Sequence, residues 1–379
     1  MATEATHTHP MTQHQLELCS TVAEQIKSLT VRTLVGFYHL GCPDGIIAAL
    51  LLKFAVRPYK AYKVILIPAF WDHSEEVIES KLKKEGIEEV DESVAIVEVD
   101  VVIPDAQQLF NKARFHTKID HHMSQRKVCL QNGGICIDNL CAAAIVAEMF
   151  FTNQGKKLSK AMQRLLEVLD HKDRYTQEFR SSRTFQALWE GVFQNLRFMD
   201  SAETLLNELI DMDDGESDLW ISSKTVAGEL LLAQRDDTIC NVLRKYVVLA
   251  IYNCVVCLVV DFDAYMAGEG CDYKTREKAR GYRAQIADIL SSLFKTPVFI
   301  IATPEKEEEQ DVYMISAGSS AECELTGLEI AQQFGGKQGH KHFAGFSTSH
   351  DEFNERVALG EKLELTPDNW KEVLLSPDE

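Results

Sequence analysis

The feature that most constrains the fold is a recurring pattern of short apolar runs, each leading into an acid or an imidazole. The runs cover residues 31–38, before His39, residues 93–99, before Asp100, and residues 115–119, before Asp120. Helix-like segments separate them, and this alternation is typical of an α/β fold with a parallel sheet. Ligands bind at the carboxyl ends of the strands in open sheets of this kind. We therefore expect these polar side chains to converge on one site.

The length of the chain indicates how many domains it forms, and its charge restricts the class of partner that it can bind. The 379 residues are long for a single domain, so we expect two. Lys and Arg total 39 against 58 Asp and Glu, which gives a net charge of −19. Such a surface repels polyanions, so we expect no long duplex nucleic acid as a partner. A small phosphorylated molecule drawn to a metal ion stays compatible with this charge.

The cysteines and the apolar runs indicate in which cellular compartment we expect the protein. Ten cysteines are scattered without regular spacing. Cys254 and Cys257 form a CxxC, but we expect both in a buried strand, which does not favour redox activity. No apolar run is long enough to span a bilayer, and residues 1–10 lack a basic flank and a signal core. We therefore expect a cytoplasmic protein in a reducing compartment, with no membrane partner.

The stretch Asp120-His121-His122 supplies a carboxylate and two imidazoles where a strand ends. This ligand set suits Mn²⁺, Fe²⁺ or Zn²⁺, and an acid beside a ligating histidine can orient its ring. Neighbouring residues on an extended chain point to opposite sides, so the two histidines should have different roles. The alternative is a surface His-His pair without a role.

Further acids and imidazoles stand at equivalent positions. His39 and Asp44 flank a turn between a strand and an apolar helix at residues 46–52, although Asp44 could simply cap that helix. Asp170 and Asp173 are three residues apart and would share a helix face. Together these side chains supply the kinds of ligand that a two-metal site needs. In such a site, two cations bind the attacking water and polarise a phosphoryl group.

The order of these motifs resembles that of the DHH phosphoesterase superfamily. Asp120-His121-His122 matches its defining motif, His39-Leu-Gly-Cys-Pro-Asp44-Gly resembles its first motif, and the strand before Asp100 resembles its second. Residues 173–188 are similar to the fourth motif of the branch whose first motif reads His-x-x-Cys-Pro-Asp-Gly. Residues 334–346 resemble the glycine-rich motif of the associated C-terminal domain. The resemblance covers roughly residues 31–350.

The resemblance implies a role for each matching side chain. The metal ligands would be His39, Asp44, Asp100, His121 and Asp173, with Asp170 as the runner-up to Asp173. Asp100 would bridge two ions, Asp120 would orient His121, and His122 would donate to the substrate phosphate. The ions would be two Mn²⁺, with Mg²⁺, Co²⁺ or Zn²⁺ as alternatives.

The chain departs from the family pattern at three places. Cys42 stands where many members have an Asp, and a thiol could ligate a softer ion or leave one metal weakly held. Lys337 and Gln338 interrupt the glycine run, and residues 316–319 lack an Arg that relatives often have. These departures keep a second hypothesis open, in which the chain is a degenerate, catalytically weak nucleotide-binding or scaffold protein. A redox protein built on the cysteines is a third.

The resemblance also implies the domain organisation. We expect an N-terminal extension (1–30), a parallel-sheet metal-binding domain (31–185), a helical linker (186–240), a smaller α/β substrate-binding domain (241–350) and an acidic tail (351–379), with the active site in the cleft between the two α/β domains. The second domain would grip the substrate through Gly335, Gly336, Gly339, His340, Lys341 and His342. The alternative is a turn with incidental charges.

These inferences predict metal-dependent hydrolysis of a phosphoester through a metal-activated water. The substrates that the resemblance implies are short oligonucleotides, cyclic dinucleotides and nucleotide phosphates. The sequence leaves a homodimer open.

Overall fold

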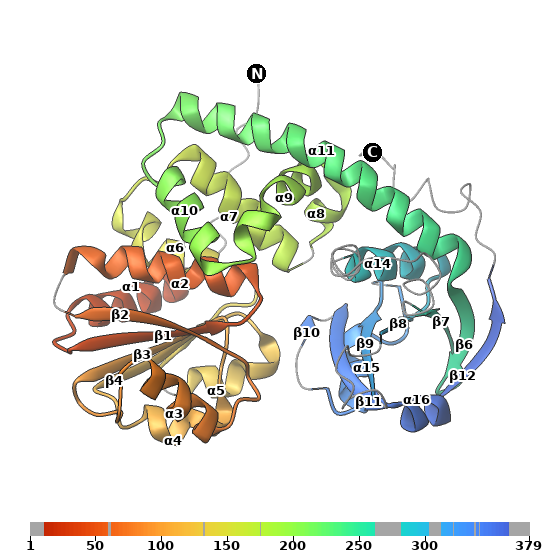
Figure 1. The fold of residues 1–379 in the computed structure, drawn as a ribbon, viewed down its shortest axis with the longest axis horizontal. Coiled ribbons are helices and arrows are strands. Elements are labelled where there is room, and N and C mark those ends of the chain that lie inside the picture. Colours follow the sequence, from red (N-terminus) through yellow and green to blue (C-terminus); the bar gives the residue numbers. More distant parts are fainter. Residues whose placement is uncertain are drawn as a thin grey trace. The chain divides into compact units, whose positions relative to one another are not determined.

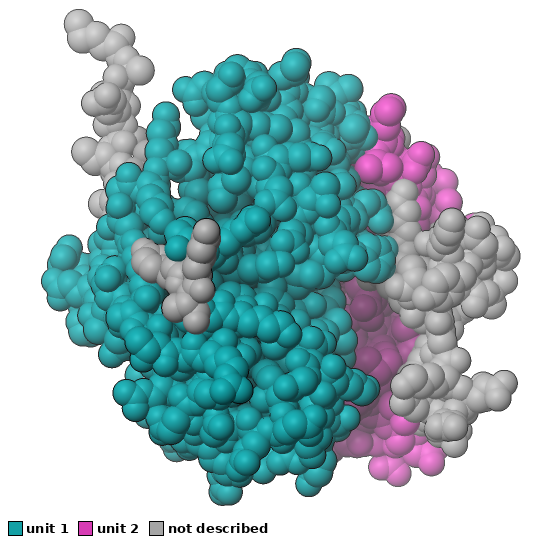
Figure 2. Space-filling view, turned by 60° about the vertical axis from the view of Figure 1, so that its left-hand side comes forward, with its two compact units in different colours: residues 1–229 teal, residues 230–379 magenta. Residues whose placement is uncertain are grey.

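The computed structural model describes residues 11–59, 62–131, 133–174, 176–261, 282–302, 312–320, 322–336, 339–340 and 342–363. Residues 1–10, Lys337, Gln338, Lys341 and the tail from residue 364 onward lie outside the described residues. The chain forms two compact units, residues 1–229 and residues 230–379, drawn in different colours in Figure 2. Each unit has its own sheet (Figure 1).

Unit 1 is built on five parallel strands in the order β2-β1-β3-β4-β5. They are β1 (Thr33–His39), β2 (Lys63–Ala69), β3 (Val94–Val99), β4 (Phe115–Asp120) and β5 (Ile135–Cys136). The chain goes from β1 outward to β2 and then crosses β1 to reach β3. This reversal places a topological switch point between β1 and β3, where open α/β sheets bind their ligands.

Helices cover both faces of this sheet (Figure 1). Leu34 of β1 packs in one apolar cluster, and its neighbour Val35 packs in the other, because successive strand residues point to opposite faces. The first face carries α1 (Gln13–Lys27), α2 (Pro43–Val56), α6 (Ala142–Phe150), α7 (Lys160–Asp173), α8 (Gln177–Ser181), α9 (Arg183–Leu196) and α10 (Met199–Leu209). The second carries α3 (Glu75–Lys84) and α4 (Gln107–Phe110). Strands buried on both faces explain the nearly continuous apolar runs in the sequence.

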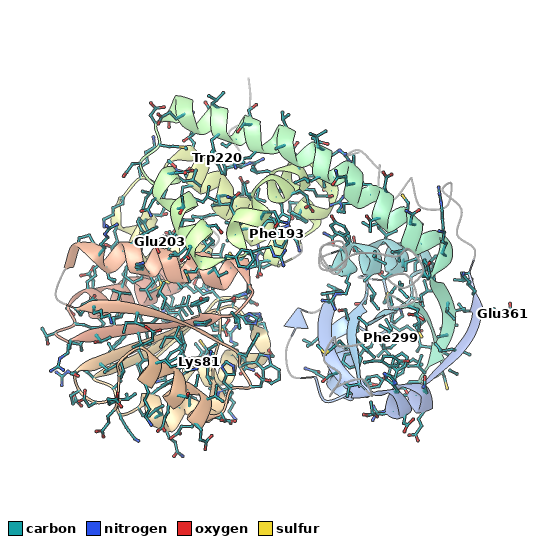
Figure 3. All side chains as sticks on the ribbon, viewed as in Figure 1. Lys81, Phe193, Glu203, Trp220, Phe299 and Glu361 are labelled. Carbon is teal, nitrogen blue, oxygen red and sulfur yellow. The ribbon has the colours of Figure 1, made fainter. Side chains whose placement is uncertain are left out.

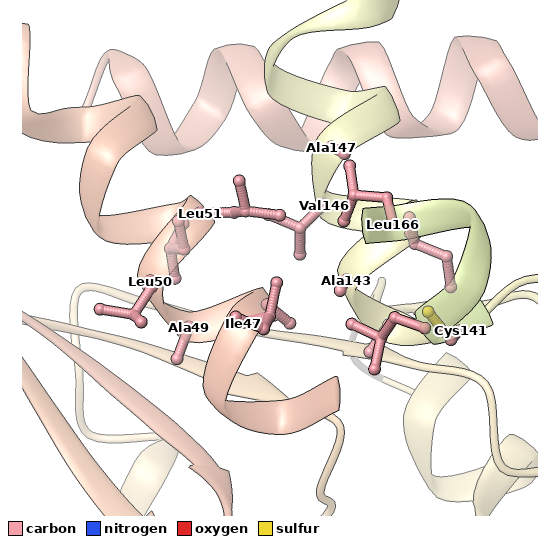
Figure 4. Close-up of a cluster of buried hydrophobic side chains, with 14 of the residues drawn as sticks. Ile47, Ala49, Leu50, Leu51, Cys141, Ala143, Val146, Ala147 and Leu166 are labelled. Atoms are coloured by element: carbon pink, nitrogen blue, oxygen red, sulfur yellow. The ribbon is translucent and has the colours of Figure 1, made fainter. Parts of the chain in front are cut away.

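Helix α2 is the centre of the larger cluster. It is apolar almost all round, and such a helix has to be buried. Figure 4 shows Ile47 and Leu51 of α2 beside Ala143 and Val146 of α6, with Leu166 of α7 close by. The Nζ of Lys53 near the end of α2 lies 2.7 Å from Oε1 of Glu203 in α10. The helix that carries Cys42 and Asp44 at its start is therefore held firmly in the unit.

Unit 2 has a mixed sheet of seven strands in the order β10-β11-β9-β8-β7-β6-β12. They are β6 (Val247–Tyr252), β7 (Val255–Asp261), β8 (Val298–Ala302), β9 (Val312–Gly318), β10 (Gly339–His340), β11 (Phe343–Ser349) and β12 (Val357–Lys362). α14 (Arg283–Phe294) covers one face, and α15 (Gly327–Gln333) and α16 (His350–Arg356) cover the other, around Phe299 (Figure 3). α11 (Asp214–Lys245) contains the division between the units and supplies core residues to both, among them Trp220 in unit 1 and Leu243 in unit 2.

The predicted fold class is confirmed, and one helix begins earlier than expected. The helix predicted to begin at Ile46 begins at Pro43, because proline is favoured at the first helical position. A 3₁₀ turn, Pro104–Ala106, precedes α4. α7 continues to Asp173, so Asp170 and Asp173 lie on one helix as expected. In the parts of the chain that the structure describes, no helix combines the length and the apolar character needed to cross a membrane.

The prediction that both cysteines of the CxxC lie in a buried strand is wrong for Cys254. Asn253 and Cys254 form the two-residue turn between β6 and β7, with φ of 49° and 66°. A tight hairpin of this kind needs positive φ at both central residues. Cys254 is therefore exposed, whereas Cys257 is buried in β7.

Candidate metal centre

The turn between β1 and α2 delivers the first three side chains of the site. His39 ends β1, Cys42 is the N-cap residue of α2, and Asp44 lies in its first turn. Gly41 has φ of 78°, which lets the chain reverse sharply. A Cβ at Gly45 would lie 3.0 Å from Oδ2 of Asp100. The start of α2 therefore lies directly against the residue that follows β3.

Asp100 occupies the centre of the site. It has φ of 57° and is 1% exposed. Its Oδ2 lies 3.5 Å from Nδ1 of His39, and its Oδ1 lies 3.2 Å from Nε2 of His121. Neither oxygen has a hydrogen bond of good geometry with a described residue. Asp100 thus presents one carboxylate oxygen to each of two neighbouring groups.

Asp120 and the two histidines end β4 and have distinct surroundings, as expected from their adjacency. Oδ1 of Asp120 accepts hydrogen bonds from the backbone nitrogens of His121 and His122, and it lies 2.8 Å from Nδ1 of His122. The expectation that Asp120 orients the His121 ring stays a prediction. Its carboxylate contacts the ring of His122, because a short side chain at a strand end folds back onto the second residue along.

The ring of His121 lies among carboxylates instead. Its Nε2 is 3.2 Å from Oδ1 of Asp100, 3.2 Å from Oδ2 of Asp173 and 3.7 Å from Oδ2 of Asp44. All of these side chains except Asp173 are buried, and Asp173 is half-buried. The ring of His121 therefore brings together residues from three other segments of unit 1.

The structure separates the two acids at the end of α7. Asp173 lies in the cluster, whereas Asp170 is held by Arg174, with Nη2 2.6 Å from Oδ2, and by the backbone nitrogen of Cys141. Arg174 is a positioning residue that the sequence motifs did not single out. The spacing of four residues between an acid and an arginine on a helix is the signal that could have indicated this pair.

Besides lying in the ligand cluster, Asp44 has a structural role that the local sequence did not indicate. Its two oxygens accept hydrogen bonds of 2.8 Å from the backbone nitrogens of Ala142 and Ala143, at the start of α6. The alternative considered from the sequence was that Asp44 caps its own helix. It satisfies the free N–H groups of α6 instead, where a negative charge is favoured by the helix dipole.

The ligand atoms form three overlapping groups, and the atoms of each group lie within 4.8 Å of one another. They are His39 with Cys42 and Asp100, Asp44 with His121 and Asp173, and Asp100 with Asp120, His121 and His122. The first two groups share no residue, and Asp100 belongs to the first while it contacts His121 of the second. The arrangement offers two adjacent cation positions with Asp100 between them.

Burial and the neighbouring charges shift the pKa values of the cluster in opposite directions. Burial, and then repulsion by Asp100 and Asp173, raises the pKa of Asp44 well above its usual range. Burial also acts to raise the pKa of Asp100, but His121 and His39 outweigh it and hold this pKa well below the usual range. Burial would lower the pKa of His122, yet Asp120 raises it to about 9.

The residues present fit divalent cations. Asp44 and Asp100 are buried carboxylates beside the half-buried Asp173, and uncompensated buried charge is strongly unfavourable. The unpartnered oxygens of Asp100 are ready acceptors for ions. Carboxylate and imidazole ligands are those that Mn²⁺, Zn²⁺ and related ions prefer.

The substrate-binding residues predicted in unit 2 lie around α15 and β10. Gly335 has φ of 80°. The backbone N–H groups of Gly335 and Gly336 donate hydrogen bonds to the carbonyl oxygens of Gln332 and Ala331, so both glycines terminate α15. Gly339 and His340 form β10 and pair with β11. Nδ1 of His342 lies 3.3 Å from Oγ of Ser319. Their role toward a substrate stays a prediction.

Comparisons with known proteins identify similar solved structures at low sequence identity. No protein-family model and no curated protein matches the chain. A solved structure described as a DHH-domain member of a family of ribosomal proteins is 15% identical, with a TM-score of 0.56 over 98% of this chain and 93% of that one. An exopolyphosphatase-related protein from Bacteroides fragilis is 14% identical, with a TM-score of 0.49 over 97% and 98%. The exonuclease RecJ bound to manganese is 13% identical, with a TM-score of 0.47 over 92% and 94%.

Proposed function

We propose that this chain, which has the fold of the DHH phosphoesterase superfamily, hydrolyses a small phosphorylated substrate with the help of two divalent cations. The observation that carries the proposal is the position of Asp100. It is buried, it belongs to the group with His39 and Cys42, and its Oδ1 lies 3.2 Å from Nε2 of His121 in the other three-residue group, while neither of its oxygens has a hydrogen-bond partner among the described residues. Such a carboxylate is suited to bridging two ions.

The ligands that we assign are His39, Asp44, Asp100, His121 and Asp173, with Mn²⁺ as the expected ion. When bound, a pair of cations would supply an activated water and would neutralise charge on the phosphoryl group. The chain keeps these ligands in place through neighbouring contacts. α6 holds Asp44 through two backbone N–H groups, and Asp170, anchored by Arg174, ties the end of α7 to Cys141.

His122 is the residue that we assign to the substrate phosphate. Oδ1 of Asp120 lies 2.8 Å from Nδ1 of His122 and orients the ring, and the protonated imidazole would donate a hydrogen bond to a phosphate oxygen. A pKa of about 9 keeps the imidazole protonated at neutral pH. A positioned cationic donor stabilises the charge that develops on phosphoryl oxygens in the transition state.

The charge of the chain supports a small substrate. A net charge of −19 opposes binding of a long polyanion, whereas short oligonucleotides, cyclic dinucleotides and nucleotide phosphates carry few charges. We expect Gly335, Gly336, Gly339, His340, Lys341 and His342 to contact the part of the substrate that is not cleaved.

Turnover of a panel of these three substrate classes with Mn²⁺ tests the proposal. The matched variants are Asp100→Asn, in the site, and Glu79→Gln, on the solvent-facing side of α3. Asparagine suits position 100 because it tolerates positive φ better than alanine does. We expect turnover by the wild type and Glu79→Gln, and at least about a hundredfold loss in Asp100→Asn. No turnover of any substrate by a wild type that retains two ions would favour a nucleotide-binding protein instead.

A further inference from the structure

Cys42 lies in the first of the two candidate cation positions. Its Sγ, a ring nitrogen of His39 and a carboxylate oxygen of Asp100 lie within 4.8 Å of one another. Nδ1 of His39 and both oxygens of Asp100 are buried atoms without a hydrogen bond to a described residue. The sulfur therefore faces atoms that the surrounding protein leaves available for an ion.

The usual structural roles of a cysteine do not account for this placement. Cys42 is the N-cap residue of α2, but its side chain makes no capping hydrogen bond. It is only partly buried and is absent from the apolar clusters that hold the other face of α2. Its Sγ instead donates a hydrogen bond to Oδ1 of Asp173, at 3.9 Å. The thiol thus lies beside both ligand groups, and it neither caps the helix nor packs in an apolar core.

We infer that Cys42 is a metal ligand and that it makes the two cation positions chemically unequal. The position formed by His39, Cys42 and Asp100 combines sulfur, nitrogen and oxygen, a donor set that favours Zn²⁺ or Co²⁺ over Mn²⁺. The position formed by Asp44, His121 and Asp173 has mainly oxygen donors and suits Mn²⁺. When the sulfur–metal bond forms, the thiol proton leaves to solvent.

This inference rests on the two-cation site of the proposed function and extends it to the identity of each ion. It predicts that the enzyme is most readily loaded with two different metals. A carboxylate at position 42 would make the positions more alike and would remove the preference for the softer ion.

Titration of the metal-free protein with Co²⁺ tests the inference without relying on activity. A thiolate bound to Co²⁺ gives an intense near-ultraviolet charge-transfer band, which nitrogen and oxygen ligands do not give. We expect two Co²⁺ per wild-type chain, with the band complete after the first equivalent. Cys42→Ser should lose the band and weaken the tighter site at least about tenfold.

Two further variants make the result specific. Cys42→Asp should bind two ions without the band and should shift the relative affinity toward Mn²⁺ over Zn²⁺ at least about tenfold. Cys141→Ala should keep the band, because Cys141 is buried nearby but belongs to none of the three ligand groups. The melting temperature of each variant shows that it is folded.

The outcomes separate this inference from the proposed function. Two Co²⁺ bound to the wild type without a charge-transfer band, or a band that persists in Cys42→Ser, would overturn the role of Cys42 and leave the two-cation site standing. Fewer than two ions in the wild type would overturn the two-cation site, and the inference with it.

Discussion

At the scale of single residues, the two adjacent histidines show how one dipeptide supplies two functions. The ring of His121 lies among three carboxylates, and the ring of His122 is held by Asp120. The difference arises because neighbouring residues at a strand end point in different directions. Removing the ring of His121 should therefore have a different effect from removing the ring of His122.

We predict that His122→Gln lowers kcat about 10²–10³-fold while both ions stay bound, because the loss is that of one donor to the transition state. His121→Gln should instead lose an ion, because it removes a ligand of the second group. Metal content by mass spectrometry, measured beside steady-state rates, distinguishes the two. A loss of metal in His122→Gln would show that its ring is a ligand.

The cysteines give a second prediction at this scale. Burial raises the pKa of Cys257 to about 12, and burial, followed by the nearby Glu148, raises that of Cys19 to about 12. A raised thiol pKa leaves little thiolate at neutral pH, and thiolate is the reactive form. Cys254 is exposed in a hairpin turn. We expect a thiol reagent at pH 7 to modify Cys254 quickly, and Cys19 and Cys257 only after unfolding, as read by peptide mass spectrometry.

The control for thiol labelling is Cys254→Ser, which should lose the fast phase of modification. Raising the pH toward 9 should leave the labelling of Cys19 slow, because its thiol stays protonated over this range. Rapid modification of Cys19 in the folded protein would contradict the buried position of α1.

At the scale of secondary-structure elements, glycines permit helices to approach closely. A Cβ at Gly228 of α11 would lie 1.7 Å from the carbonyl oxygen of Ala187 in α9, and one at Gly191 of α9 would lie 2.0 Å from that of Lys224 in α11. These separations are far below contact distance, so the two helices would have to move apart. Trp220 of α11 and Phe193 of α9 lie on the same pair of helices (Figure 3).

We predict that Gly228→Ala destabilises the protein by about 1–3 kcal/mol or more, because overpacking displaces backbone. Gly215→Ala in the first turn of the same helix meets only a flexible Asp213 oxygen at 3.4 Å. It should stabilise by up to about 1 kcal/mol through the lower entropy of the unfolded chain. Urea unfolding followed by circular dichroism measures both, and equal effects of the two variants would refute the close approach of α9 and α11.

At the scale of the whole molecule, the site concentrates negative charge in a chain that is already strongly acidic. Asp44, Asp100 and Asp173 meet in one cluster, while the net charge is −19. Ions that bind the folded cluster and not the unfolded chain must stabilise the folded state. The stability of the molecule and the occupancy of its metal centre are therefore coupled.

We predict that Mn²⁺ raises the melting temperature and that a chelator lowers it. A free concentration about 100 times the dissociation constant should contribute about 2.7 kcal/mol per site. Asp100→Asn is the test variant, and Glu79→Gln is the control. The same rise in all three proteins would place the stabilising ion outside the centre around Asp100.

What the sequence determines by itself is the parallel sheet and the meeting of its polar strand ends. The runs before His39, Asp100 and Asp120 are local signals, and a parallel arrangement brings their carboxyl ends to one edge whatever the details of packing. The predicted fold class is confirmed for this reason.

Only the tertiary structure decided which neighbours each polar side chain meets. Asp173 lies in the cluster and Asp170 does not, because Arg174 and the backbone of Cys141 hold Asp170. Asp44 caps α6, nearly a hundred residues further along the chain, and Asp120 contacts the ring of His122. Such contacts depend on long-range packing and on the direction of single side chains, and neither is contained in the local spacing of residues.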